Sequence, residues 1–259
     1  MMKRFWLSCL CIGISSGLFS AEESRRVRIA RENAPAVVAI NVLYPSAATF
    51  TGTGFVLTPE GLIATNRHVI EGASYVNVTF SDGTISAEAV PVSAASQVDL
   101  ALLKIPAKHL RTVKVVSSAD VEAGQSITVI GNPRRLQNTV SSGLISQVRK
   151  KPDGTLWHQI SAPISPSSSG SPVFNRQGEV ISIAFASYAG ENNQNLNFAV
   201  PSDYLLQLVR ESGYTLPPTA STAAQAAPAS NALVRHIQKA WAILRQMISR
   251  FRTKDPTRT

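Results

Sequence analysis

Short apolar segments separated by turn signals run through most of the chain, and they constrain the fold more than any other feature. Asp82-Gly83, Asp153-Gly154 and Gln177-Gly178 stand between such segments, where a glycine favours a tight hairpin turn. The segments form two groups joined near residues 115–122, with no long helix among them. They comprise residues 37–42, 54–57, 62–65, 75–80, 85–92 and 100–105, then 126–131, 139–148, 156–160, 173–175, 180–187 and 197–200. Two groups of about six strands predict an all-β fold of two antiparallel barrels.

The boundaries of these groups define the expected domain organisation. The first barrel is expected at about residues 36–118 and the second at about 119–201, within one domain of residues 22–214. A short helix is predicted over residues 24–33, ending before Pro35, and Pro201-Ser202-Asp203 predicts the start of another that Gly213 closes.

A Pro/Ala-rich linker is predicted over residues 215–231, because this stretch has almost nothing to pack. A basic amphipathic helix is predicted over residues 232–259. Its apolar positions recur at alternating steps of three and four, at Val234, Ile237, Trp241, Leu244, Ile248 and Phe251.

The N-terminus has the pattern of an export signal over residues 1–21. Lys3 and Arg4 precede an apolar run from Phe5 to Phe19, which is short for a membrane span. Cleavage after Ala21 would place Phe19 where a small residue is preferred, so an uncleaved signal anchor stays open as an alternative. We therefore expect a periplasmic or secreted protein. The alternative is association with a membrane through an uncleaved signal anchor or the C-terminal helix.

Cysteine content and charge exclude several function classes. Both cysteines lie within the signal segment, so the exported chain cannot be a cysteine enzyme, a disulfide scaffold or a thiolate zinc site. The four histidines show no ligand spacing, and we expect no metal and no other cofactor. Of the net charge of +9, residues 232–259 carry +6 and Lys3 with Arg4 carry +2. The body is thus nearly neutral, and no nucleic-acid partner is expected.

A run of small and turn-forming residues, 161–175, enters an apolar strand and contains three consecutive serines before Gly170. Upstream lie His68, three residues after the predicted strand 62–65, and Asp99, directly before the predicted strand 100–105. A nucleophilic serine needs a base to take its proton and an acid to hold that base in the right tautomer. All three groups are present, each at the edge of an apolar strand.

With these residues in hand, the chain resembles the chymotrypsin-fold serine proteases, most closely their HtrA/Deg branch. The resemblance spans about residues 35–210. The matching segments follow the family order: Gly52-Thr53-Gly54-Phe55-Val56-Leu57, Gly61-Leu62-Ile63-Ala64-Thr65-Asn66-Arg67-His68-Val69, Asp99-Leu100-Ala101-Leu102-Leu103-Lys104-Ile105, Ile130-Gly131-Asn132-Pro133, Thr139-Val140-Ser141-Ser142-Gly143, Ala162-Pro163-Ile164-Ser165-Pro166 with Ser169-Gly170, and Asn197-Phe198-Ala199-Val200-Pro201.

This resemblance implies a cleft between the barrels in which His68 is the general base, Asp99 orients it and Ser169 is the nucleophile. The backbone amides of Ser167 and Ser169 would form the oxyanion hole. The implied function is that of an exported serine endopeptidase that cleaves unfolded or damaged proteins, in protein quality control.

The sequence departs from the family pattern next to the nucleophile. The family reads Gly-Asn-Ser-Gly-Gly-Pro, whereas residues 167–172 read Ser-Ser-Ser-Gly-Ser-Pro. Ser167 therefore stands where glycine lets the backbone turn its amide toward the substrate oxygen, and a side chain restricts the allowed dihedrals. The alternative function is accordingly a catalytically weak or silent protease fold that binds peptides as a chaperone-like protein.

The substrate pocket is predicted from the same resemblance. Its base would lie near Pro163 and its wall along residues 181–187, with Ile183, Ala184 and Phe185 as candidate lining. No Asp, Glu or His occurs there, so we expect selectivity for small or medium aliphatic side chains. His109 and His158 are expected to be surface or lining residues.

Members of the family usually carry a peptide-binding PDZ domain, but only about 45 residues follow Gly213. The helix at residues 232–252 is then the candidate for recruitment or assembly. Three roles stay open for it: self-association as a coiled coil, binding to an anionic membrane, and docking of an acidic partner.

Overall fold

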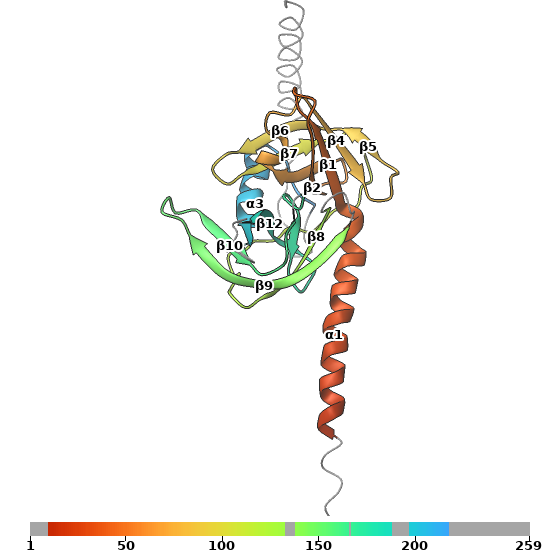
Figure 1. The fold of residues 1–259 in the computed structure, drawn as a ribbon, viewed down its shortest axis with the longest axis vertical. Coiled ribbons are helices and arrows are strands. Elements are labelled where there is room, and N and C mark those ends of the chain that lie inside the picture. Colours follow the sequence, from red (N-terminus) through yellow and green to blue (C-terminus); the bar gives the residue numbers. More distant parts are fainter. Residues whose placement is uncertain (1–9, 133–137, 166, 188–196, 218–259) are drawn as a thin grey trace, which may run out of the picture.

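The structure, a computed structural model, describes residues 10–132, 138–165, 167–187 and 197–217. The start of the predicted signal, most of the predicted linker and the whole predicted helix 232–259 lie outside the described residues. Two β units, stacked along the long axis of the molecule, make up its body (Figure 1).

The first β unit is a curled antiparallel sheet of seven strands in the order β5-β4-β1-β2-β3-β7-β6. Side chains of β4 alternate, with Val76, Val78 and Phe80 facing the core. Strand β3 is buried along its whole length, and β12 of the second unit packs against it. The strands are β1 (Val37–Leu43), β2 (Thr49–Val56), β3 (Leu62–Asn66), β4 (Tyr75–Phe80), β5 (Ser86–Glu88), β6 (Val90–Ala95) and β7 (Leu100–Lys104).

The second β unit is a closed six-stranded barrel in the order β10-β13-β12-β11-β8-β9. Its interior is filled by small and branched apolar side chains, among them Ile127, Val129, Ile145 and Ile160. The strands are β8 (Ser126–Gly131), β9 (Thr139–Lys150), β10 (Leu156–Ile160), β11 (Pro172–Phe174), β12 (Val180–Ser187) and β13 (Asn197–Pro201).

The predicted all-β class is confirmed, with one difference in the first unit. The stretch 85–92 forms two short strands, β5 and β6, because buried Ala89 separates them and they pair with different partners, β4 and β7. These two edge strands are not paired with each other in the described sheet, so the first unit is an open, curled half-barrel. Pro91 lies on edge strand β6, where a residue without a backbone donor is tolerated.

Helix α1 (Leu10–Asn33) begins away from the body and ends at the β units, followed by the short turn η1 (Ala34–Ala36) (Figure 1). It ends before Pro35, as predicted, but begins well before residue 24. Ile29 is fully buried, and Glu22 accepts a 2.7 Å hydrogen bond from Arg176 of the second unit. Within the described part of the chain, no helix has the length and hydropathy needed to cross a membrane.

Helix α3 (Ser202–Glu211) lies where it was predicted and secures the connection between the two β units. The Asp203 carboxylate accepts hydrogen bonds from the Ser117 hydroxyl at 2.8 Å and from the Ser118 amide at 2.9 Å. Ser202 donates to the Val116 carbonyl at 2.6 Å. The first turn of α3 thereby holds the crossing segment against the second barrel.

His158 is buried, and the prediction that it is a surface or lining residue is wrong. Along β10, His158 and Ile160 face the barrel interior, whereas Trp157 packs on its other face against Phe185 and Phe198, with centroid separations of 4.8 and 5.5 Å. The His158 ring lies 2.5 Å from the Ser182 hydroxyl, measured from Nδ1 to Oγ. Burial disfavours the charged imidazolium and lowers the pKa of His158 from 6.5 to about 4.

Acid should therefore destabilise the fold through His158. Between pH 6.5 and about 4, His158 is protonated in the unfolded chain but neutral in the folded chain. The free energy of unfolding therefore falls as the pH drops. The loss reaches about 3 kcal/mol at the lower end of this window. Urea unfolding of wild type and His158→Asn at several pH values measures it, because asparagine can bond Ser182 but does not titrate. Equal slopes in the two proteins would disprove the assignment.

Candidate active site

Strand pairing brings His68 and Asp99 together although 31 residues separate them. Antiparallel pairing of β3 with β7 places Asn66 opposite Leu100. His68, two residues after Asn66, and Asp99, one residue before Leu100, therefore lie at the same end of this strand pair. His68 lies on the one-turn helix α2 (Arg67–Ile70) that continues β3. The Asp99 carbonyl accepts hydrogen bonds from the Arg67 amide at 3.1 Å and from Asn66 Nδ2 at 2.9 Å.

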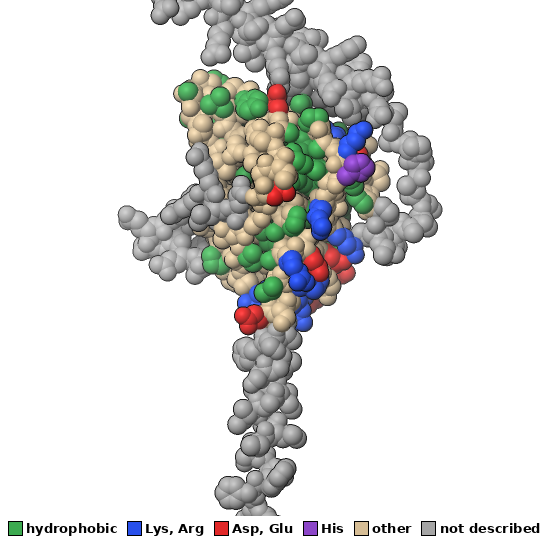
Figure 2. All heavy atoms as spheres, turned by 90° about the vertical axis from the view of Figure 1, so that its right-hand side faces the viewer, with side chains coloured by type: hydrophobic (Ala, Val, Ile, Leu, Met, Phe, Trp, Pro, Cys, Tyr) green, Lys and Arg blue, Asp and Glu red, His purple; other side chains and the backbone are tan. Residues whose placement is uncertain are grey.

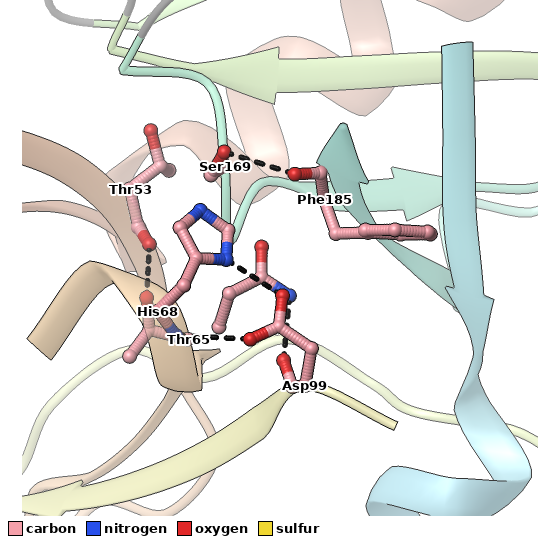
Figure 3. A network of polar contacts seen from close by, with 7 residues as sticks. Thr53, Thr65, His68, Asp99, Ser169 and Phe185 are labelled. Atoms are coloured by element: carbon pink, nitrogen blue, oxygen red, sulfur yellow. Dashed lines mark hydrogen bonds and ion pairs between the residues drawn. The ribbon is translucent and has the colours of Figure 1, made fainter. Parts of the chain in front are cut away.

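The Asp99 carboxylate binds His68 at two points. Oδ2 lies 2.6 Å from His68 Nδ1, and Oδ1 accepts the His68 backbone amide at 2.9 Å. This pairing fixes the ring, and a proton on Nδ1 leaves Nε2 as the basic nitrogen. In Figure 3 the ring lies between Asp99 and Ser169, with its second nitrogen facing Ser169. The site is open to solvent, since 42% of the His68 side chain is exposed.

Ser169 lies on the loop between β10 and β11, and the backbone around it is bonded on both sides. Its carbonyl accepts the Thr53 amide from the first unit at 2.9 Å, and the Gly170 amide donates to the Ala184 carbonyl at 2.8 Å. Gly170 has φ +89°, and a Cβ there would lie 2.0 Å from the Thr53 carbonyl oxygen. Only glycine fits at residue 170, which explains why a glycine follows Ser169.

The Ser169 hydroxyl donates to the Phe185 carbonyl at 3.1 Å (Figure 3). It must therefore turn about its Cα–Cβ bond before it can donate to His68. Catalytic hydrogen bonds are often formed only once substrate is bound, so this arrangement is compatible with a nucleophile at rest.

The backbone amides of the loop that carries Ser169 fall into two groups, those that are hydrogen-bonded within the protein and those that are free to bind a substrate oxygen. Those of Ser168, Gly170 and Ser171 donate to backbone carbonyls, whereas the amides of Ser167 and Ser169 have no acceptor among the described residues. Ser167 has φ +77°, in the left-handed region that a glycine adopts readily. The side chain at residue 167 thus does not prevent this conformation, which leaves two amides available to a developing oxyanion.

The four predicted pocket residues occupy different environments. Ile183 and Ala184 are fully buried, in separate apolar clusters, and offer no accessible side-chain surface to a substrate. Pro163 is exposed, and the half-buried Phe185 turns its ring away from Ser169 toward Trp157. Of these four, only Pro163 and Phe185 have surface that a substrate can reach.

Residues of opposite charge are interleaved on the face drawn in Figure 2, where Lys and Arg side chains lie beside Asp and Glu. Three ion pairs of this kind join Arg28 to Glu32, Lys114 to Glu179 and Arg176 to Glu22. On this face the two signs of charge therefore offset each other.

Thr53 is the residue at the site that sequence reasoning missed. The sequence assigns it no role beyond membership of the segment 52–57, yet it is fully buried and bonds the loop that carries Ser169. A polar residue between two glycines, directly before the apolar run Phe55-Val56-Leu57, was the available signal.

Comparison with known proteins places this geometry among proteases. Residues 52–183 match the profile of the trypsin-like peptidase domain. The chain is 32% identical over 260 residues to "Protease Do-like 1, chloroplastic" of Arabidopsis thaliana, covering 83% of this chain and 59% of the relative. It is 35% identical over 165 residues to "Probable periplasmic serine endoprotease DegP-like" of Halomonas elongata, covering 61% and 34%.

The structural comparison agrees. The solved structure "HtrA-type protease AlgW with tripeptide" superposes with a TM-score of 0.67 at 28% identity, covering 72% of this chain and 62% of that one. The chain spans roughly a third to three fifths of the length of the curated relatives it matches. No PDZ family is detected in its 259 residues.

Proposed function

Because the chain belongs to the HtrA/Deg family of trypsin-like serine proteases, we propose that it is an exported serine endopeptidase acting on unfolded or damaged polypeptides. The observation that carries the proposal is the two-point hydrogen bond between Asp99 and His68, with the ring facing Ser169. Digestion of unfolded casein beside a Ser169→Ala variant tests it.

In the proposed mechanism, a bound peptide carbonyl approaches the two available amides of Ser167 and Ser169. The Ser169 hydroxyl turns from the Phe185 carbonyl to His68 Nε2, which takes its proton as the oxygen attacks. The resulting imidazolium is stabilised by the Asp99 carboxylate and then protonates the leaving amine. Water repeats the sequence on the acyl-enzyme and releases the second product.

Polypeptides are the substrate class that the comparisons favour. Related HtrA-type proteases were solved with a tripeptide and with a decapeptide. The exposed imidazole and the loop-borne serine also suit an extended chain better than a small enclosed ligand. Quality control of exported proteins is the role we propose on this basis.

Selectivity should favour small or medium aliphatic side chains before the cleaved bond. Pro163 and Phe185 bring no charge to the predicted pocket, so a basic side chain would lose hydration without gaining a partner. Cleavage of a mixed peptide library, read by mass spectrometry, should give aliphatic residues at that position. Cleavage mainly after Lys or Arg would overturn this prediction.

Relatives of the chain are periplasmic or chloroplastic proteases. Together with the predicted signal over residues 1–21, this supports export to the periplasm or outside the cell. The roles of residues 232–252 in self-association or at an anionic membrane stay predictions.

Two observations favour the second candidate, a silent peptide-binding protein with a protease fold. The Ser169 hydroxyl is bonded to Phe185 instead of His68, and Ser167 replaces the glycine of the family. This candidate predicts that unfolded chains bind equally to wild type and Ser169→Ala, with cleavage by neither.

A further inference from the structure

Thr53 joins the two β units at the loop that carries the nucleophile. It lies on β2 and is fully buried. Its amide donates to the Ser169 carbonyl at 2.9 Å, and its hydroxyl donates to the Ser167 carbonyl at 2.8 Å. The same hydroxyl accepts the Asn132 amide at 3.0 Å, and the Thr53 carbonyl accepts the Thr65 hydroxyl at 2.7 Å (Figure 3).

Ser167 is the partner that most needs such a bond. It is the third residue of a turn closed by the Ser168 amide and the Ser165 carbonyl, which lie 3.0 Å apart. Its φ of +77° brings Cβ close to the backbone, so a serine adopts this conformation at a cost that glycine does not incur. The surroundings of Ser167 must therefore offset that cost.

The hydroxyl of Thr53 is placed to do so. The carbonyl and the amide of Ser167 are joined through one Cα, so a backbone rotation that relieves the positive φ also moves the carbonyl away from its partner. Breaking the bond would leave the part-buried Ser167 carbonyl without this donor and the buried Thr53 hydroxyl without an acceptor, although the hydroxyl would still accept the Asn132 amide; these losses oppose the rotation.

We propose that Thr53 is a positioning residue for catalysis: its hydroxyl bonds the Ser167 carbonyl and so keeps the Ser167 amide available to the reacting carbonyl. The inference rests on the proposed function, since it concerns the oxyanion hole of that reaction. It also explains how a chain with serine in place of the family glycine can keep this part of the site formed.

A double-mutant cycle tests the coupling between the two residues. Wild type, Thr53→Val, Ser167→Gly and the double variant are compared in the full chain, with fluorescein-labelled casein as substrate. Valine keeps the shape of threonine but removes the donor, and glycine removes the cost of the positive φ. Thr53→Ser restores the hydroxyl. Thr51→Val removes another buried hydroxyl bond on the same strand, to Asn41, and serves as the stability control.

In the wild-type background, Thr53→Val should lower kcat by about 10²-fold, the size of effect seen when one oxyanion donor is lost, with little change in KM. With glycine at residue 167 the same substitution should lower kcat by about tenfold or less. Thr53→Ser should retain most of the wild-type kcat. The rate of labelling by a fluorophosphonate, which also needs the oxyanion hole, should follow the same order.

Equal fold-losses in both backgrounds would overturn the inference, as would a kcat for Thr53→Val no lower than that of Thr51→Val. Urea unfolding checks that each variant is folded. Should Thr53→Val fail to fold, Thr53→Cys replaces it in the cycle, because a thiol fills similar space and is a weaker donor. An inactive wild type would instead contradict the proposed function, so the two failures are distinguishable.

Discussion

Replacing Ser169 by alanine should lower the turnover of unfolded casein on the order of 10⁶-fold. The hydroxyl is the nucleophile of the proposed mechanism, and without it His68 has no group to activate. Residual turnover would come from water attacking a carbonyl still held by the amides of Ser167 and Ser169. Quantified release of casein fragments over long incubations measures the loss.

The fold should tolerate this change, because among the described residues the Ser169 hydroxyl makes one hydrogen bond, to the Phe185 carbonyl. Thermal unfolding of both proteins provides the control. Turnover within tenfold of wild type by a folded Ser169→Ala protein would show that another group performs the cleavage.

Replacing Asp99 by asparagine should lower kcat by about 10⁴-fold. An amide of the same size can still sit beside His68, but it presents a donor or a weaker acceptor to Nδ1 and favours the tautomer with the proton on Nε2. The imidazole then cannot take the proton of Ser169. Steady-state kinetics with casein measures the change.

Asparagine is also the substitution best matched to the backbone at residue 99. Asp99 has φ +54°, a left-handed conformation that asparagine and aspartate tolerate better than most residues. Asp99→Ala would add backbone strain to the chemical loss, so it is the less informative variant. If a stable Asp99→Asn protein kept more than a tenth of the wild-type kcat, Asp99 would not be the orienting group.

The sequence was sufficient to predict most strands, because apolar segments bounded by Asp-Gly and Gln-Gly turns leave little choice of period or length. It failed between β5 and β6, where residues 85–92 look continuous and only the choice of pairing partner divides them. It also failed at His158. The neighbouring Trp157 looks like the core residue of that strand, but it packs against Phe185 and Phe198 on the other face.

At the site, the resemblance of the segments around His68, Asp99 and Ser169 to the HtrA/Deg motifs was enough to nominate the three residues. Their relative orientation was not predictable, because the direction of the Ser169 hydroxyl depends on a contact with β12 and the bond from Thr53 to Ser167 depends on a contact between the two β units. The pocket prediction failed to anticipate burial: Ile183 and Ala184 follow the strand pattern but lie inside apolar clusters.

Labelling with a fluorophosphonate probe tests the central claim most directly, because the probe reacts with a serine only when a base activates it and amides stabilise the adduct. The account predicts stoichiometric labelling of the purified protein at Ser169, located by peptide mass spectrometry and absent in Ser169→Ala. A folded wild-type protein that takes up no label would contradict the claim that this chain is an active serine protease.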